Sequence, residues 1–170
     1  MSFLGNNRPD LLKNANSEPE ATPRGSEARF IGEVPSARAE DLSLAAARAA
    51  AHIGPFEFEL TVAGAFPKQS APRVLWIGTS DSSGKLHDLY SRLEAECAQV
   101  GFAKDQREFH PHLTIARLRK PRGARTLALA HEELGFESLT VGVSELLVIR
   151  SELGSQGSKY SVISRSPLGS

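Results

Sequence analysis

Phe109-His110-Pro111-His112-Leu113-Thr114-Ile115-Ala116-Arg117 is the stretch around which the rest of the chain can be arranged. It alternates like a strand, with Leu113 and Ile115 on one face and His112 and Thr114 on the other. Residues two apart on a strand lie about 6.5–7 Å apart along one face, so an imidazole and a hydroxyl there can converge on one phosphate. We expect the apolar face to anchor the strand in a sheet and the polar face to carry the chemistry.

A cluster of positive charge follows this strand directly. Residues 117–125 contain five basic side chains and no acidic one. A solvated loop is one interpretation of such a run, and a phosphate-steering patch beside His112 is the other. On the second interpretation, four side chains are candidate substrate-binding residues: Arg117, Arg119, Lys120 and Arg122.

Length and composition limit the class of protein. The chain has 170 residues, 20 Lys plus Arg against 20 Asp plus Glu, and a single cysteine, Cys97. One domain with a substantial core is expected, and any nucleic-acid binding must come from a local patch because there is no net charge. No apolar run approaches a membrane helix, and one cysteine forms no internal disulfide. We expect a cytoplasmic monomer with no membrane partner.

The first 28 residues differ in composition from the rest. They contain no valine, isoleucine, tyrosine or tryptophan and are rich in Asn, Ser, Glu and Pro. Such a segment can bury little apolar surface. We therefore divide the chain into a disordered or non-native leader (1–28), one domain (29–168) and a short tail (169–170).

Hydrophobic periodicity predicts alternating helices and strands between these limits. The predicted helices are 36–53, with Ser36 as N-cap and Gly54 as stop, then 83–100, ended by Gly101, and 124–134, stopped by Gly135. The predicted strands are 56–62, 73–77, 109–117, 139–143 and 146–149, with a change of parity near residues 142–145, and a last one at 160–163 that pairs across the turn 154–157. Since several strands are joined as hairpins, the pattern favours an α+β fold with mostly antiparallel sheet.

Two single features leave alternatives open. Trp76 is a candidate for core packing beside Val74, Leu75 and Ile77, or for stacking a nucleobase. His110 and His112 form a His-x-His pair that ligates zinc when further ligands converge, but no third ligand motif is apparent. We therefore expect no metal and no cofactor.

Five segments in one order resemble the bacterial RNA 2′,3′-cyclic phosphodiesterases of the two-histidine phosphoesterase superfamily, the group named for 2′-5′ RNA ligase activity. They are Arg29–Pro35, Gly64–Pro67, Pro72–Trp76, His110–Arg117 and Arg150–Leu153. The resemblance implies a two-lobed, pseudo-symmetric fold of mostly antiparallel sheets with helices packed outside. It also implies metal-independent hydrolysis of a terminal cyclic phosphate on RNA or a nucleotide, with His112 as general base and Thr114 as phosphate donor.

The chain departs from this family at one motif. The family uses two His-x-Thr motifs, and the first should immediately precede Arg29, where the sequence reads Gly25-Ser26-Glu27-Ala28. The other histidines, His52, His87 and His131, have no threonine two places on. We expect an incomplete N-terminal lobe, and either a weakened enzyme or a phosphate-binding module of the same fold without catalysis.

Overall fold

The computed structural model describes residues 2–6, 29–119, 122–135, 137–154 and 157–169. In chain order the elements are β1 (Ser2–Asn6), β2 (Phe30–Gly32), the 3-10 turn η1 (Ser36–Arg38), α1 (Ala39–Ala50), β3 (Phe56–Phe66), β4 (Val74–Ser80), α2 (Lys85–Gln99), β5 (His112–Arg117), α3 (Ala124–Leu134), β6 (Leu139–Val143), β7 (Glu145–Gly154) and β8 (Gly157–Pro167). None of the helices in these ranges is long and apolar enough to span a membrane.

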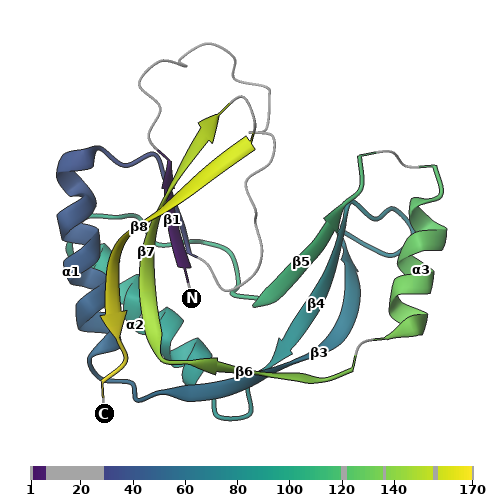
Figure 1. Ribbon diagram of the computed structural model, residues 1–170, viewed down its shortest axis with the longest axis horizontal. Helices are drawn as coiled ribbons and strands as arrows, with labels where there is room; N and C mark the ends of the chain where they lie inside the picture. Colours follow the sequence, from purple (N-terminus) through teal and green to yellow (C-terminus); the bar gives the residue numbers. More distant parts are fainter. Residues whose placement is uncertain (1, 7–28, 120–121, 136, 155–156, 170) are drawn as a thin grey trace.

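The strands form two sheets, with the orders β2-β1-β7-β8 and β5-β4-β3-β6. The second sheet is antiparallel throughout, whereas β1 runs parallel to both β2 and β7 in the first. Figure 1 shows the two sheets facing each other, with α1 outside the first, α3 outside the second, and β3 and β6 running across the base. The prediction of an α+β fold with mostly antiparallel sheet is confirmed.

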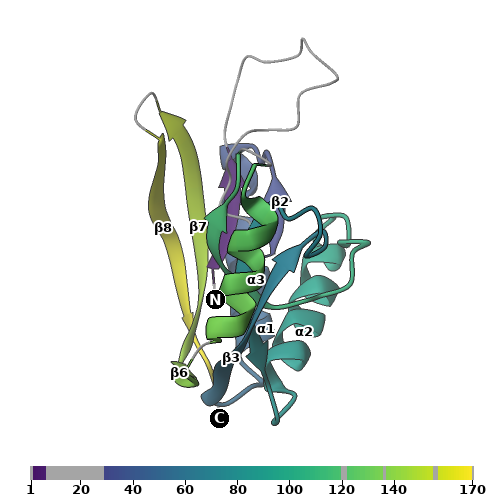
Figure 2. The ribbon, with the colours of Figure 1, turned by 90° about the vertical axis from the view of Figure 1, so that its right-hand side faces the viewer.

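The core lies between the two long helices and the start of β3. Figure 2 shows α2 beside α1, and alanines on α1 are almost fully buried, which allows this close approach. On α2, four side chains are buried in the same cluster as Phe56, Phe58 and Leu60: Leu86, Leu89, Leu93 and Cys97. Burial raises the pKa of the Cys97 thiol to about 11, so this cysteine is a packing residue.

The predicted helix ends are partly wrong. Residues 36–38 form the 3-10 turn, so α1 begins at Ala39 rather than at a Ser36 cap, and it ends at Ala50 before Gly54 is reached. Gly101 and Gly135 do follow the ends of α2 and α3, with φ of 82° and 65°. Both have a positive φ, which glycine accepts without steric cost.

β3 is longer than predicted and irregular. Glu57 and Glu59 are exposed, as its alternation indicated, but the register shifts between Leu60 and Val62, and Val62 is 57% exposed. The change of parity predicted near residues 142–145 is the point at which the chain leaves β6 in one sheet and enters β7 in the other. The predicted hairpin of the last two strands is confirmed, with Gly154 opposite Gly157.

The apolar face of β5 does not anchor the strand, so that prediction is wrong. Leu113 and Ile115 are 40% and 50% exposed. The reason is the position of β5 at the edge of its sheet: α3 packs over β3 instead and leaves the outer face of β5 uncovered.

The predicted domain boundaries stay predictions. Ser2–Asn6 forms β1 between β2 and β7, and the remainder of the predicted leader lies outside the described residues. At the other end, the amide of Gly169 donates to the carbonyl of Ala50 at 3.0 Å.

Candidate functional site

A bulge in β5 brings three of the candidate residues onto one face. His112 lies opposite Gly78 and Thr114 opposite Trp76, but Ala116 pairs with Leu75, so Ile115 has no partner on β4. One extra residue shifts the alternation. Arg117 therefore pairs with Val74 and lies on the same side as His112 and Thr114, which simple alternation would have excluded.

A hydrogen bond to the backbone fixes the orientation of the His112 ring and determines which ring nitrogen carries the hydrogen. Its Nδ1 lies 2.7 Å from the carbonyl oxygen of His110. Because a carbonyl only accepts, Nδ1 must carry a hydrogen and donate. In the neutral imidazole the lone pair is then on Nε2, which is the atom a general base uses.

An aromatic stack supports the His112 ring. The indole of Trp76 lies against the backbone of Gly64 and Gly78, since a Cβ at either position would collide with it. Phe66 stacks on the indole with centroids 5.0 Å apart, and the His112 ring meets Phe66 edge-on at 5.2 Å and Trp76 at 6.2 Å. These contacts restrain the imidazole in addition to its backbone hydrogen bond.

This stack corrects the prediction of core packing for Trp76. The buried neighbours Leu75 and Ile77 point to the other side of β4, and Trp76 is not part of the buried cluster. Its indole nitrogen is buried without a partner in the described structure. With Phe66 over the indole, Trp76 supports the site, and the outer face of Phe66 is the aromatic surface nearest His112.

A second aromatic contact holds the segment that enters β5. Phe109 stacks on Tyr90 of α2, with centroids 4.0 Å apart and an interplanar angle of 7°, and meets His87 edge-on at 5.3 Å. The pKa of Tyr90 is raised, mainly by burial and then by the nearby Glu94 carboxylate. The Thr79 hydroxyl also donates to the Pro111 carbonyl at 3.2 Å. The residues before His112 are thus fixed to α2 and β4.

A buried ion pair links the start of β2 to the same segment, and sequence reasoning missed it. Arg29 is 3% and Glu94 8% exposed. Arg29 donates to the Glu94 carboxylate and to the Ala103 carbonyl, and Glu94 also accepts from the Asp105 amide at 2.9 Å. The pair therefore joins the residue before β2 to the loop before β5.

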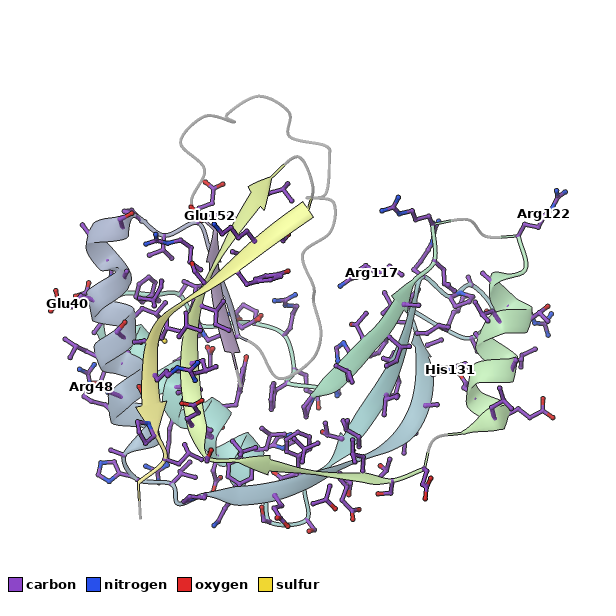
Figure 3. The ribbon with its side chains drawn as sticks, in the orientation of Figure 1. Glu40, Arg48, Arg117, Arg122, His131 and Glu152 are labelled. Atoms are coloured by element: carbon purple, nitrogen blue, oxygen red, sulfur yellow. The ribbon has the colours of Figure 1, made fainter. Side chains whose placement is uncertain are left out.

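The basic cluster does not act as one patch. In Figure 3, Arg117 points from the end of β5 into the space between the sheets, whereas Arg122 lies at the start of α3 and points away from it. Arg119 is exposed, and Lys120 lies outside the described residues. Of the four predicted substrate-binding residues, the structure places Arg117 on the same face of β5 as His112 and Thr114.

The histidine pair has other partners in this structure. His110 lies beside Glu108, with Nε2 and Oε2 3.2 Å apart, and His112 uses Nδ1 on the backbone. Among the residues that the structure describes, no group of three or more His, Cys, Asp or Glu side chains is placed to hold a metal ion.

Comparison with known proteins assigns the chain to a family. The model of the 2′-5′ RNA ligase superfamily matches residues 29–155. An RNA 2′,3′-cyclic phosphodiesterase of Aeropyrum pernix is 35% identical over 138 residues, which cover 79% of this chain and 76% of the relative. Another, from Geobacillus stearothermophilus, is 32% identical over 145 residues, 82% of this chain and 43% of the relative.

The fold agrees with this assignment. The crystal structure of E. coli LigT complexed with 3′-AMP superposes with a TM-score of 0.63 at 24% identity, covering 84% of this chain and 75% of that one. The chain therefore belongs to the 2′-5′ RNA ligase superfamily, among the RNA 2′,3′-cyclic phosphodiesterases.

Proposed function

We propose that this chain opens the terminal 2′,3′-cyclic phosphate of RNA or of a nucleotide to a phosphomonoester, slowly, with His112 as general base. The observation that carries the proposal is the hydrogen bond from His112 Nδ1 to the His110 carbonyl at 2.7 Å. It leaves Nε2 as the acceptor on the face that also carries Thr114 and Arg117.

In this reaction Nε2 of His112 takes a proton from water as the water oxygen bonds to phosphorus. The bond from phosphorus to one ribose oxygen breaks, and that oxygen must gain a proton. The Thr114 hydroxyl and the Arg117 guanidinium would hold the charged phosphoryl oxygens. Phe66 offers the ribose or base an apolar contact beside His112.

We expect protonation of the leaving ribose oxygen to be the inefficient step of the reaction in this chain. The family's acid is the histidine of the first motif, and the sequence has Gly25 in that place. Solvent water can supply the proton at a cost, since one general acid typically contributes about 10²–10⁴-fold. We therefore expect a two-lobed, pseudo-symmetric fold in which one lobe supplies the catalytic motif and the other is incomplete.

A phosphate-binding module without turnover is the second candidate. The same missing motif favours it, because holding a terminal phosphate needs Thr114 and Arg117 but no acid. The substrate class is the same in both cases, so hydrolysis is the property that separates them.

The test is hydrolysis of a nucleoside 2′,3′-cyclic phosphate without added metal, followed by phosphorus NMR. We expect slow opening that survives a chelator and disappears in His112→Ala. His110→Ala is the matched control, because the His110 carbonyl remains when its ring is removed. Loss in both variants with recovery on adding zinc would favour the His-x-His metal site instead, and binding with no turnover at all would favour the module.

A further inference from the structure

The bulge in β5 interrupts the ladder between β4 and β5 at Trp76. In a regular antiparallel pair the backbone carbonyls of alternate residues accept hydrogen bonds from the neighbouring strand, and a bulge disturbs this pairing locally. Here the two residues Thr114 and Ala116 pair with the consecutive Trp76 and Leu75. The position of Arg117 on the His112 face depends on this one-residue slip.

His131 of α3 contacts the backbone at this point. Its Nε2 lies 3.0 Å from the carbonyl oxygen of Trp76. Because the carbonyl only accepts, Nε2 carries the hydrogen and donates. Figure 3 places His131 on the side of α3 that faces the strands, one turn beyond the buried Ala128 that packs this helix on the sheet.

We propose that His131 is a positioning residue: its hydrogen bond to the Trp76 carbonyl holds the bulge that places Arg117 on the same face of β5 as His112 and Thr114. The proposal rests on the proposed function only in taking a terminal phosphate as the partner of Arg117. His131 itself lies behind the sheet and does not touch the substrate.

The first test needs no substrate. Hydrogen exchange of the amides of residues 113–117 is compared in the wild-type chain, His131→Leu, His131→Gln and Ala128→Gly. Losing the donor should speed exchange at 115–117 in His131→Leu, and the amide of glutamine should restore protection. Ala128→Gly is the control, because it weakens α3 by removing a buried methyl while His131 stays. Equal acceleration in Ala128→Gly would reduce His131 to a general packing residue and overturn the proposal.

The second test measures binding of a short RNA with a 3′-phosphate and a 5′ fluorophore by anisotropy, at several salt concentrations. Each phosphate contact to a single strand contributes about 0.7 to the slope of log affinity against log salt. We expect Arg117→Ala and His131→Leu each to lower the slope by about that amount, and the double variant to equal Arg117→Ala alone. The proposal would be refuted if the slope changes of the two single variants added up in the double variant, or if His131→Leu left the slope unchanged.

The two tests separate the inference from the proposed function. If the wild-type chain binds no phosphorylated RNA, the proposed function fails, and the exchange data still decide whether His131 holds the bulge. If RNA binds but the His131 substitutions leave amide exchange at 115–117 unchanged, the inference alone fails.

Discussion

Each of the two sheets contains a register shift between neighbouring strands, but the side chains beside the two shifts differ. In the second sheet the extra residue Ile115 moves Arg117 onto the inner face, the face that also carries His112. In the first sheet the register shifts between Val148 and Ile149 of β7, which places Ile163 of β8 out of pairing. There the residues opposite Ser151 and Ile149 are Tyr160 and Val162, which are 44% and 45% exposed.

The fold alone therefore does not supply the chemistry. Val148 belongs to the buried core beneath α1, so Tyr160 and Val162 lie on the other side of their sheet. One sheet thus offers an imidazole, a hydroxyl and a guanidinium, and the other offers an aromatic ring and a branched aliphatic. We expect this asymmetry to limit the reaction, and the contacts around β5 to hold the active side in place.

The largest effect should come from removing the asymmetry. By resemblance to the family, Gly25→His with Glu27→Thr restores the first His-x-Thr motif and with it an acid for the leaving ribose oxygen. We expect hydrolysis of a nucleoside 2′,3′-cyclic phosphate to rise by about 10²–10⁴-fold, measured as kcat. The same pair of substitutions with His112→Ala is the control and should show no gain. A gain that does not need His112 would remove this histidine from the mechanism.

Most helices and strands could be predicted from the sequence, because burial of one face imposes a regular spacing on the apolar residues. α3 was predicted with its observed bounds, since Ala124, Ala128 and the stop at Gly135 are local signals. The break between β6 and β7 was visible as a change of parity for the same reason. Where one face of an element packs on the core, the pattern of apolar and polar residues indicates that face.

The site was less predictable because its features depend on pairing between strands. Alternation does not reveal which residue of β5 lacks a partner, so neither the exposure of Ile115 nor the face of Arg117 followed from it. The support of His112 requires Gly64 opposite Trp76, which are twelve positions apart in the sequence. Arg29 and Glu94 are separated by 65 positions, and nothing in either segment indicates the other.

The next largest effect should come from the buried ion pair. Glu94→Gln leaves the Arg29 guanidinium buried without its counter-charge, and breaking a buried pair in this way costs about 3–5 kcal/mol. We expect that loss of unfolding free energy in urea. Because Glu94 also accepts from the Asp105 amide, the segment before β5 should loosen as well. Replacing both partners by Arg29→Met and Glu94→Leu should recover much of the loss, and failure to recover it would assign the cost to packing.

A smaller effect is expected at the glycine beneath Trp76. In Gly64→Ala the new methyl collides with the indole, and overpacking of this kind costs about 1–3 kcal/mol. The displaced indole should move Phe66 and the His112 ring, so hydrolysis should fall together with the free energy of unfolding. Gly142→Ala is the matched control, since its Cβ meets no atom within 4 Å. Equal losses in both variants would mean that strand propensity, and not the aromatic stack, is being measured.

The smallest effect concerns the loop that leads into β5. The Arg107 side chain donates to Asp105 at 2.6 Å and 2.9 Å, and this hydrogen bonding lowers the pKa of the Asp105 carboxyl. A carboxyl whose pKa is lower in the folded chain stabilises it above the unfolded pKa of about 3.9, and the contribution disappears as pH falls through the folded value. Since the Arg107 side chain is 65% exposed, we expect less than about 1 kcal/mol. Unfolding free energies of the wild-type chain and Arg107→Gln should differ slightly at pH 6 and converge as the pH falls below 4. A difference that persists at low pH would come from lost packing of the arginine stem and not from the ion pair.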